Sequence, residues 1–148
     1  MPQPKFVVVP LGTGGTAAGL ALAFAIAERP VVVVGARVVP RIVARIGRVR
    51  SLAHATAKLI ERVSGARVPR VKPSMITIDQ SVFGGAYGRA TAAGDEAAGQ
   101  ARETAAITLD GTYSAKALAG ALRLASDSPT LFWLTFDSRI LDDHATAS

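Results

Sequence analysis

The chain has 148 residues, 49% hydrophobic and 19% charged, a composition typical of a folded domain with one sizeable core and not of a disordered segment. It contains no cysteine, which excludes disulfides, thiolate zinc sites and a cysteine nucleophile. With only two histidines, His54 and His144, the sequence predicts no metal site. A net charge of +6 favours an anionic partner: a nucleotide, a phosphate-bearing cofactor or a nucleic acid.

The positive charge is concentrated in one segment. Residues 37–72 contain ten basic residues and a single acid, whereas acids outnumber bases in the rest of the chain. One hypothesis is a nucleic-acid-binding module that uses the arginines spaced along this segment. The segment lacks Phe, Tyr and Trp, however, which favours a solvated helix face and leaves the nucleic-acid-binding module as an alternative.

The N-terminal stretch 6–27 carries no charge, and Ala25–Ala27 has the small-x-small form of a signal-peptidase site. A loop at 10–16, rich in glycine, divides this stretch into two pieces. Each piece is far shorter than the roughly 20 residues that a membrane-spanning helix needs. We therefore expect neither a membrane span nor a secretory signal, and we expect a cytoplasmic protein.

The first half of the chain alternates apolar runs with helical patterns. Phe6–Val9 is β-branched and continuous, as in a strand buried on both faces. Thr16 can cap a helix over Ala17–Glu28, and Val31–Val34 predicts a second buried strand. Apolar residues at helical spacing from Ile42 to Val63 then predict a long amphipathic helix that ends at Gly65.

The second half continues the alternation. Met75–Ile78 predicts a short extended piece before a glycine-rich loop, and Thr91 begins a helix over Ala92–Glu103. Ala106–Leu109 is a strand candidate and Ser114–Leu124 a helix. A final strand is predicted over 130–135. The alternation predicts a single α/β domain over 1–148: three layers, with a mostly parallel sheet and helices on both faces.

The glycine-rich loop after the first strand predicts a phosphate site. Between a buried strand and a helix start, such a turn gathers backbone N–H groups beside the positive end of the helix dipole. Glycine suits the turn because it adopts positive φ and leaves the amides accessible. The loop residues are Gly12, Thr13, Gly14, Gly15 and Thr16.

Two phosphate ligands fit this loop. Gly12-x-Gly14-x-x-Ala17 matches the dinucleotide-binding pattern, and Arg37 after the second strand suits the 2′-phosphate of NADP. An NADP-binding domain is therefore an alternative. The sequence beyond residue 70 favours another cofactor.

Three motifs together resemble one enzyme family. The first is the loop in 11–20, LGTGGTAAGL; the second is GGAYG at 84–88 with Thr91; the third is the segment 109–120, LDGTYSAKALAG. In this order they resemble fold type II (tryptophan synthase β-like) pyridoxal-phosphate (PLP) enzymes, in particular the D-cysteine desulfhydrase and aminocyclopropane-carboxylate (ACC) deaminase branch. The resemblance implies the larger, cofactor-binding domain of such an enzyme.

The resemblance implies a role for each matching residue. The loop residues 12–16 hold the cofactor phosphate. Tyr87 and Tyr113 are the catalytic tyrosines that flank the ring and a small amino-acid substrate, where a phenol can pass a proton. Ser114 meets the pyridine nitrogen, although without the family it also makes a good helix N-cap. A serine there favours desulfhydrase-like chemistry, such as conversion of D-cysteine to pyruvate, sulfide and ammonia.

The family's Schiff-base lysine has no counterpart in the chain. In the family it lies in a Ser-x-Lys-x-Arg segment of the first half, whereas this chain has only Lys5, Lys58, Lys72 and Lys116, none in that context. The resemblance therefore predicts a chain that lacks the family's N-terminal half and is inactive alone. We expect it to form a homo-oligomer or to pair with the missing half, because a parallel sheet buries both faces.

Smaller departures from the family pattern affect the ring site. The family's Glu-Gly pair falls on Ala105-Ala106, and Gly111 replaces a proline. Paired glycines after the last strand are replaced by Phe136-Asp137, although Thr135 is kept. Bulky side chains at these glycines predict weaker binding of the cofactor ring.

Overall fold

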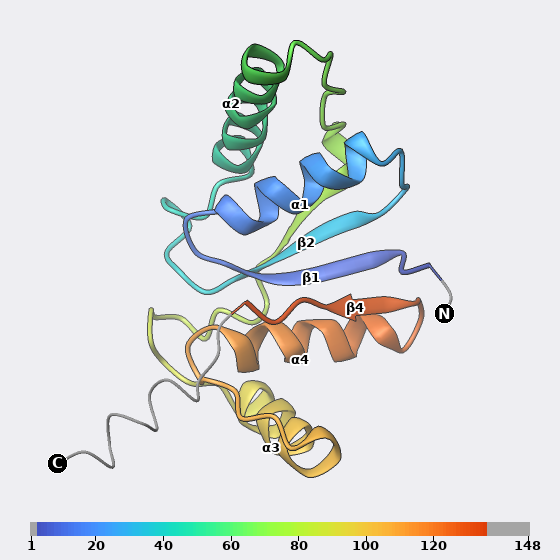
Figure 1. The fold of residues 1–148 in the computed structure, drawn as a ribbon. Helices are drawn as coiled ribbons and strands as arrows, with labels where there is room; N and C mark the ends of the chain where they lie inside the picture. Colours follow the sequence, from blue (N-terminus) through green and yellow to red (C-terminus); the bar gives the residue numbers. More distant parts are fainter. Residues whose placement is uncertain (1–2, 136–148) are drawn as a thin grey trace, which may run out of the picture.

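The computed structural model describes residues 3–135; Phe136, Asp137 and His144, discussed above, lie outside this range. Within it, four parallel strands form one sheet in the order β3-β2-β1-β4. Helices α1 and α2 cover one face, while α4 covers the other and α3 packs outside α4 (Figure 1). The predicted parallel α/β fold with helices on both faces is confirmed.

The central strands are the valine runs of the sequence. Strand β1 (Phe6–Leu11) pairs with β2 (Val32–Arg37) on one side and with β4 (Thr130–Phe132) on the other. Strand β3 (Ile76–Asp79), preceded by a 3-10 turn at Pro73–Met75, forms the far edge. Because consecutive side chains of a strand point to opposite faces, the continuous runs supply a core on each side.

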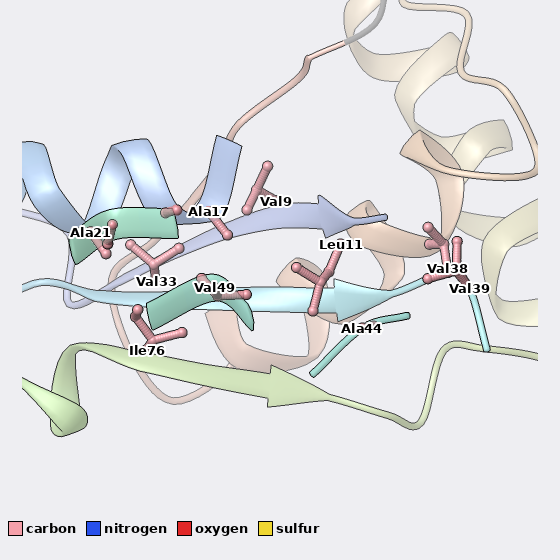
Figure 2. Packing of buried hydrophobic residues seen from close by; sticks show 12 residues of the cluster. Val9, Leu11, Ala17, Ala21, Val33, Val38, Val39, Ala44, Val49 and Ile76 are labelled. Atoms are coloured by element: carbon pink, nitrogen blue, oxygen red, sulfur yellow. The ribbon is translucent and has the colours of Figure 1, made fainter. Parts of the chain in front are cut away.

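The larger core lies between the sheet and the helices α1 (Gly15–Ile26) and α2 (Ile46–Ser64). Figure 2 shows Val9, Leu11 and Val33 meeting Ala21 and Val49 of these helices. Val8 and Val34 point the other way, toward Ala117 and Ala121 of α4 (Ser114–Ala125). The small alanines let the helices lie close to the valine-covered sheet.

Helix α3 (Ala92–Ala105) contacts mainly α4 and forms the outermost part of the fold. It begins after Thr91, as predicted, and Thr91 caps it: its Oγ1 accepts a hydrogen bond from the Gly94 N–H at 3.1 Å. Gly65 ends α2 as predicted, in the left-handed conformation with φ of 71°.

Three predicted helix or strand boundaries are wrong. Thr16 does not cap α1, because Gly14 adopts φ of 93° and lets the helix begin directly at Gly15. The amphipathic pattern from Ile42 overestimates α2, which begins only at Ile46 after a turn. The predicted last strand is also too long, since β4 ends at Phe132.

Ala106–Leu109 is not a strand. Ala106 ends α3 in the left-handed conformation, with φ of 55°, and the chain then crosses to α4. Leu109 packs between α3 and α4, against Ala101 and Ala115, and not in the sheet. The segment is an exposed connector of which only Leu109 is buried.

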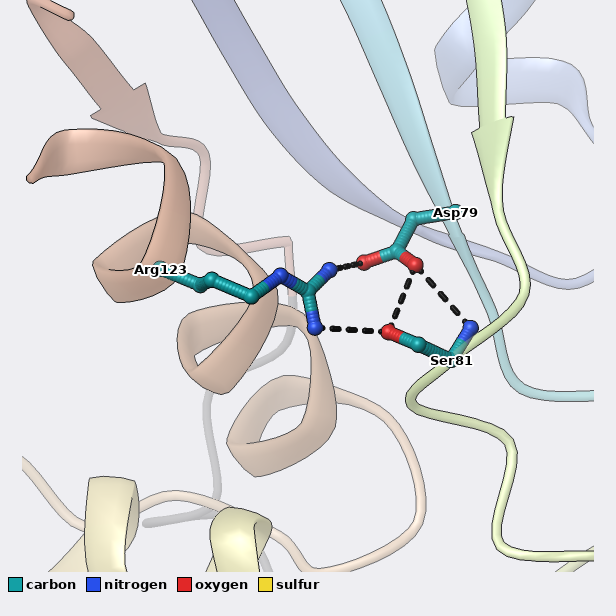
Figure 3. Close-up of polar contacts among 3 residues, drawn as sticks. All are labelled: Asp79, Ser81 and Arg123. Atoms are coloured by element: carbon teal, nitrogen blue, oxygen red, sulfur yellow. Dashed lines mark hydrogen bonds and ion pairs between the residues drawn. The ribbon is translucent and has the colours of Figure 1, made fainter. Parts of the chain in front are cut away.

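A polar cluster joins the carboxyl end of β3 to α4. Asp79 accepts hydrogen bonds from the Ser81 hydroxyl at 2.8 Å and from its N–H at 3.0 Å, and pairs with the Arg123 guanidinium (Figure 3). Arg123 also donates to the Ser81 hydroxyl. The cluster holds the β3 edge against α4, on the side of the sheet opposite to α1.

No helix of residues 3–135 is long and apolar enough to cross a membrane.

Candidate functional site

The carboxyl ends of the strands open onto a cavity of about 430 Å³. It lies where β1 has β2 on one side and β4 on the other, with α1 leaving toward one face of the sheet and α4 on the opposite face. Such a point, where the strand order reverses, is the usual ligand site of open parallel sheets. The cavity is lined by Pro10, Gly12, Thr13, Gly14, Gly15, Thr16, Val39, Val43, Tyr87, Tyr113 and Thr135.

The glycine-rich loop forms one wall of the cavity. Gly14 takes the left-handed conformation, and α1 begins at Gly15 without a side-chain cap from the described residues. The first-turn N–H groups of a helix have no partner within the helix, so they remain available to an anion. A Cβ built on Gly15 would have no heavy atom within 4 Å, so space beside these amides is open.

The other two glycines of the loop differ, because Gly14 is tightly packed and Gly12 is in ordinary contact distance of its neighbour. A Cβ on Gly14 would lie 3.0 Å from Cγ2 of Val49, and one on Gly12 would lie 3.8 Å from the Tyr113 ring. Gly14 therefore lets the loop pack closely on Val49 of α2. Gly12 lies beside the ring of Tyr113, which belongs to the opposite wall of the cavity.

That opposite wall carries the two predicted tyrosines. Their hydroxyl oxygens are 2.5 Å apart and share a hydrogen bond, and the rings meet edge to face with centroids 6.1 Å apart. The hydrogen bond to Tyr87, partial burial and the negative charge of Asp110 all favour the neutral phenol, and they raise the pKa of Tyr113 above its usual value. Tyr87 is 57% exposed and remains accessible from solution.

Asp110 fixes where Tyr113 stands. Its carboxylate accepts N–H hydrogen bonds from Thr112, Tyr113 and Ser114 at 3.0, 2.6 and 3.0 Å, which caps the start of α4. Burial raises the pKa of Asp110, but the neighbouring Ser114 hydroxyl and these three N–H groups lower it further, to below the usual value. Asp110 therefore stays ionised and holds the helix start that carries Tyr113.

Ser114 lies apart from the cavity lining. It is the first residue of α4 and 1% exposed. The predicted N-cap role of Ser114 is therefore wrong, because Asp110 in the turn before it caps the helix. Its Oγ has no well-formed hydrogen bond in the described part of the chain. Ser114 does not face the cavity, and contact between Ser114 and a cofactor stays a prediction.

Sequence reasoning missed part of the lining. Val39 and Val43 reach the cavity from the chain that follows β2, and Thr135 from the chain that follows β4. Their place directly after a predicted strand could have indicated them, because the carboxyl ends of parallel strands lie at one edge of the sheet. The sequence indicates Thr135 only as a residue shared with the resembled family after the last strand.

Arg37 is not placed for a 2′-phosphate in this cavity. Its guanidinium lies over the Phe83 ring, 4.1 Å from the centroid, and Nη1 donates to the Val39 carbonyl at 3.2 Å. The side chain is therefore engaged elsewhere and does not line the cavity. This geometry argues against the NADP-binding alternative.

The basic segment forms a separate surface. Arg41, Arg45 and Arg48 surround a wide, open depression of about 1130 Å³ at the start of α2. All three are exposed; Arg41 and Arg45 precede the helix and Arg48 lies in it. None of them lines the smaller cavity that holds the glycine loop and the tyrosines.

Comparison with protein-family models and with curated proteins finds no match. Among solved structures, the fold is similar to that in a crystal structure of an ACC deaminase homologue, with 25% identity and a TM-score of 0.69. This chain resembles an ACC deaminase homologue. The match covers 87% of this chain and 38% of the homologue, so the chain spans well under half of that protein. This likeness agrees with the resemblance to fold type II PLP enzymes that the three sequence motifs carry.

Proposed function

We propose that this chain binds PLP, with the cofactor phosphate at residues 12–16 and the ring toward the tyrosines. It would be the cofactor-binding portion of a lyase or deaminase that acts on a small amino acid. The observation that carries the proposal is the open space at Gly15: it lies beside the uncapped start of α1, in a cavity whose other wall is the tyrosine pair. The likeness to the ACC deaminase homologue supports the choice of PLP.

The residues present suit this cofactor. Backbone N–H groups and the Thr13 and Thr16 hydroxyls can bind a phosphate dianion. When bound, PLP supplies an electron sink for charge that develops at the substrate α-carbon. The tyrosine hydroxyls can hold or pass one proton at the substrate side of the ring, and the raised pKa of Tyr113 keeps that proton in place at neutral pH.

Turnover requires a lysine that this cavity does not contain. Lys5, Lys58, Lys72 and Lys116 are the lysines of the sequence, and none is a lining residue. We therefore propose that a Schiff-base lysine comes from polypeptide outside this sequence, supplied by a partner or by further chain. The D-cysteine desulfhydrase-like activity is proposed on the same basis, from Ser114 at the position where the family has a carboxylate or a hydroxyl.

Two glycine substitutions on α1 test the phosphate site. Gly15→Glu places a carboxylate in the open space beside the amides, so we expect phosphate binding at least about tenfold weaker. Gly19→Glu, one turn further along the same helix, adds the same charge where a Cβ also meets nothing within 4 Å. Because Gly19 lies outside the cavity lining, this control should bind as the unaltered protein does.

The probe should be pyridoxine 5′-phosphate, measured by isothermal calorimetry. It keeps the ring and the phosphate but has no aldehyde, so surface lysines cannot capture it covalently. Equal affinities for the two glutamate variants would contradict the proposal, as would undetectable binding by the unaltered protein. Competition by inorganic phosphate would show that the phosphate group contributes to the affinity.

A further inference from the structure

Lys116 is a buried lysine outside the cavity. It lies in the first turn of α4 and is 0% exposed. Its Nζ donates a hydrogen bond to the carbonyl of Phe83 at 3.1 Å. Gly94 at the start of α3 lies against the Lys116 side chain, since a Cβ there would be in van der Waals contact with Cγ of Lys116 at 3.6 Å. An amine so enclosed cannot reach a substrate, although burial lowers its pKa.

Phe83 begins the loop that carries Tyr87. This loop, residues 83–88, turns through three glycines with positive φ, at Gly84, Gly85 and Gly88. Such a segment has few conformational restraints of its own. Its start is held by the bond to Lys116 and by the Arg37 guanidinium over the Phe83 ring.

A second contact also lies near the start of the loop. Gly84 packs on Thr91, because a Cβ on Gly84 would collide with the Thr91 methyl group. Thr91 is itself fixed as the cap of α3. Tyr87 therefore stands on a segment that starts and ends at two residues in contact, Gly84 and Thr91.

Lys116 and Tyr113 are three residues apart at the same end of α4. The hydrogen bond from Lys116 to Phe83 thus connects the start of α4, next to Tyr113, with the loop that carries Tyr87. We infer that Lys116 is a positioning residue, which holds loop 83–88 so that the hydroxyls of Tyr87 and Tyr113 meet. The functional meaning of that meeting rests on the proposed function, but the positioning itself can be measured without any cofactor.

The chain is well suited to this measurement because Tyr87 and Tyr113 are its only tyrosines. Spectrophotometric titration near 295 nm therefore reports this pair alone. In the unaltered protein we expect two separate transitions, since the pKa of Tyr113 is raised by its partner. Lys116→Met keeps the length of the side chain and removes the donor, and it should bring the higher transition down toward the usual tyrosine value.

Three controls separate positioning from general damage. Lys58→Met, at an exposed position on α2, makes the same charge change and should leave both transitions unaltered. Tyr87→Phe should lower the Tyr113 pKa directly. Adding Lys116→Met to Tyr87→Phe should then cause no further shift, because both changes act through the same contact.

The inference is overturned if Lys116→Met folds and keeps the two transitions apart, or if it shifts Tyr113 equally in the Tyr87→Phe background. Should Lys116→Met fail to fold, NMR of the unaltered protein with ¹⁵N-labelled lysine decides the matter. Slowly exchanging Nζ protons with a nuclear Overhauser effect to the Phe83 backbone are expected, and rapid exchange at Lys116 would refute the contact. Pyridoxine phosphate binding tests the proposed function separately. Gly15→Glu should weaken that binding and leave the tyrosine titration unaltered.

Discussion

Replacing Leu11 with alanine is expected to lower the free energy of unfolding by about 3–5 kcal/mol. Leu11 is 1% exposed and is the largest fully buried apolar side chain, at the end of β1. It packs over Gly35 of β2 and lies beside the position of the Gly14 Cβ. Its loss removes buried apolar area and leaves a cavity under the glycine loop. Urea denaturation followed by circular dichroism measures the change.

Two further variants make this expectation specific. Leu59→Ala removes the same atoms at a site that is 55% exposed, and should cost no more than about 0.5 kcal/mol. Gly35→Ala alone should cost about 1–3 kcal/mol, because its Cβ would lie 2.9 Å from Cδ2 of Leu11. In the Leu11→Ala background this cost should fall, since two of the three close contacts are gone. Strict additivity of the two changes would contradict the packing described here.

Replacing Asp110 with alanine is expected to lower the free energy of unfolding by about 2–3 kcal/mol at neutral pH. The change leaves three N–H groups at the start of α4 without their acceptor. Asp110→Asn keeps one acceptor oxygen and should recover part of the loss. Asp127→Ala, at an exposed position just after α4, should have little effect. An Asp110→Ala variant as stable as the Asp127→Ala control would contradict the capping role.

The same residue predicts a dependence of stability on pH. The folded state lowers the pKa of Asp110, so the unfolded chain takes up a proton at higher pH than the folded protein does. The stabilisation is therefore fully present above the unfolded pKa of about 4 and is lost as the pH falls through the lower folded value. Urea midpoints of the unaltered protein should fall more steeply below about pH 4 than those of Asp110→Asn.

Features of the fold that depend on local sequence could be predicted. The valine runs of β1 and β2 are buried on both faces, and their continuous hydrophobicity indicates this. Thr91 and Gly65 mark a helix start and a helix end by their own chemistry. The motifs also identified two groups of residues, the glycine loop and the tyrosine pair, that the fold brings to one cavity.

Features that depend on contacts between distant residues could not be predicted. Ala106–Leu109 has the composition of a strand, but the place of Leu109 between α3 and α4 makes it a connector. Nothing in the local pattern shows that Lys116 is buried, because its partner is a backbone carbonyl 33 residues earlier. Asp110 caps α4 from four residues before the helix begins. Ser114, the first residue of the helix, has the side chain of a typical N-cap, so the local sequence predicts the wrong capping residue.

The two walls of the cavity lead into helices on opposite faces of the sheet. The glycine loop leads into α1, whereas Tyr113 stands immediately before α4, which covers the other face (Figure 1). The Tyr113 side chain packs against the core that α1 and α2 share, so a molecule that touches both walls contacts the starts of two helices beside one core. Its binding energy adds to the stability of the native state as a whole, by thermodynamic linkage, and not to that of a single helix or loop.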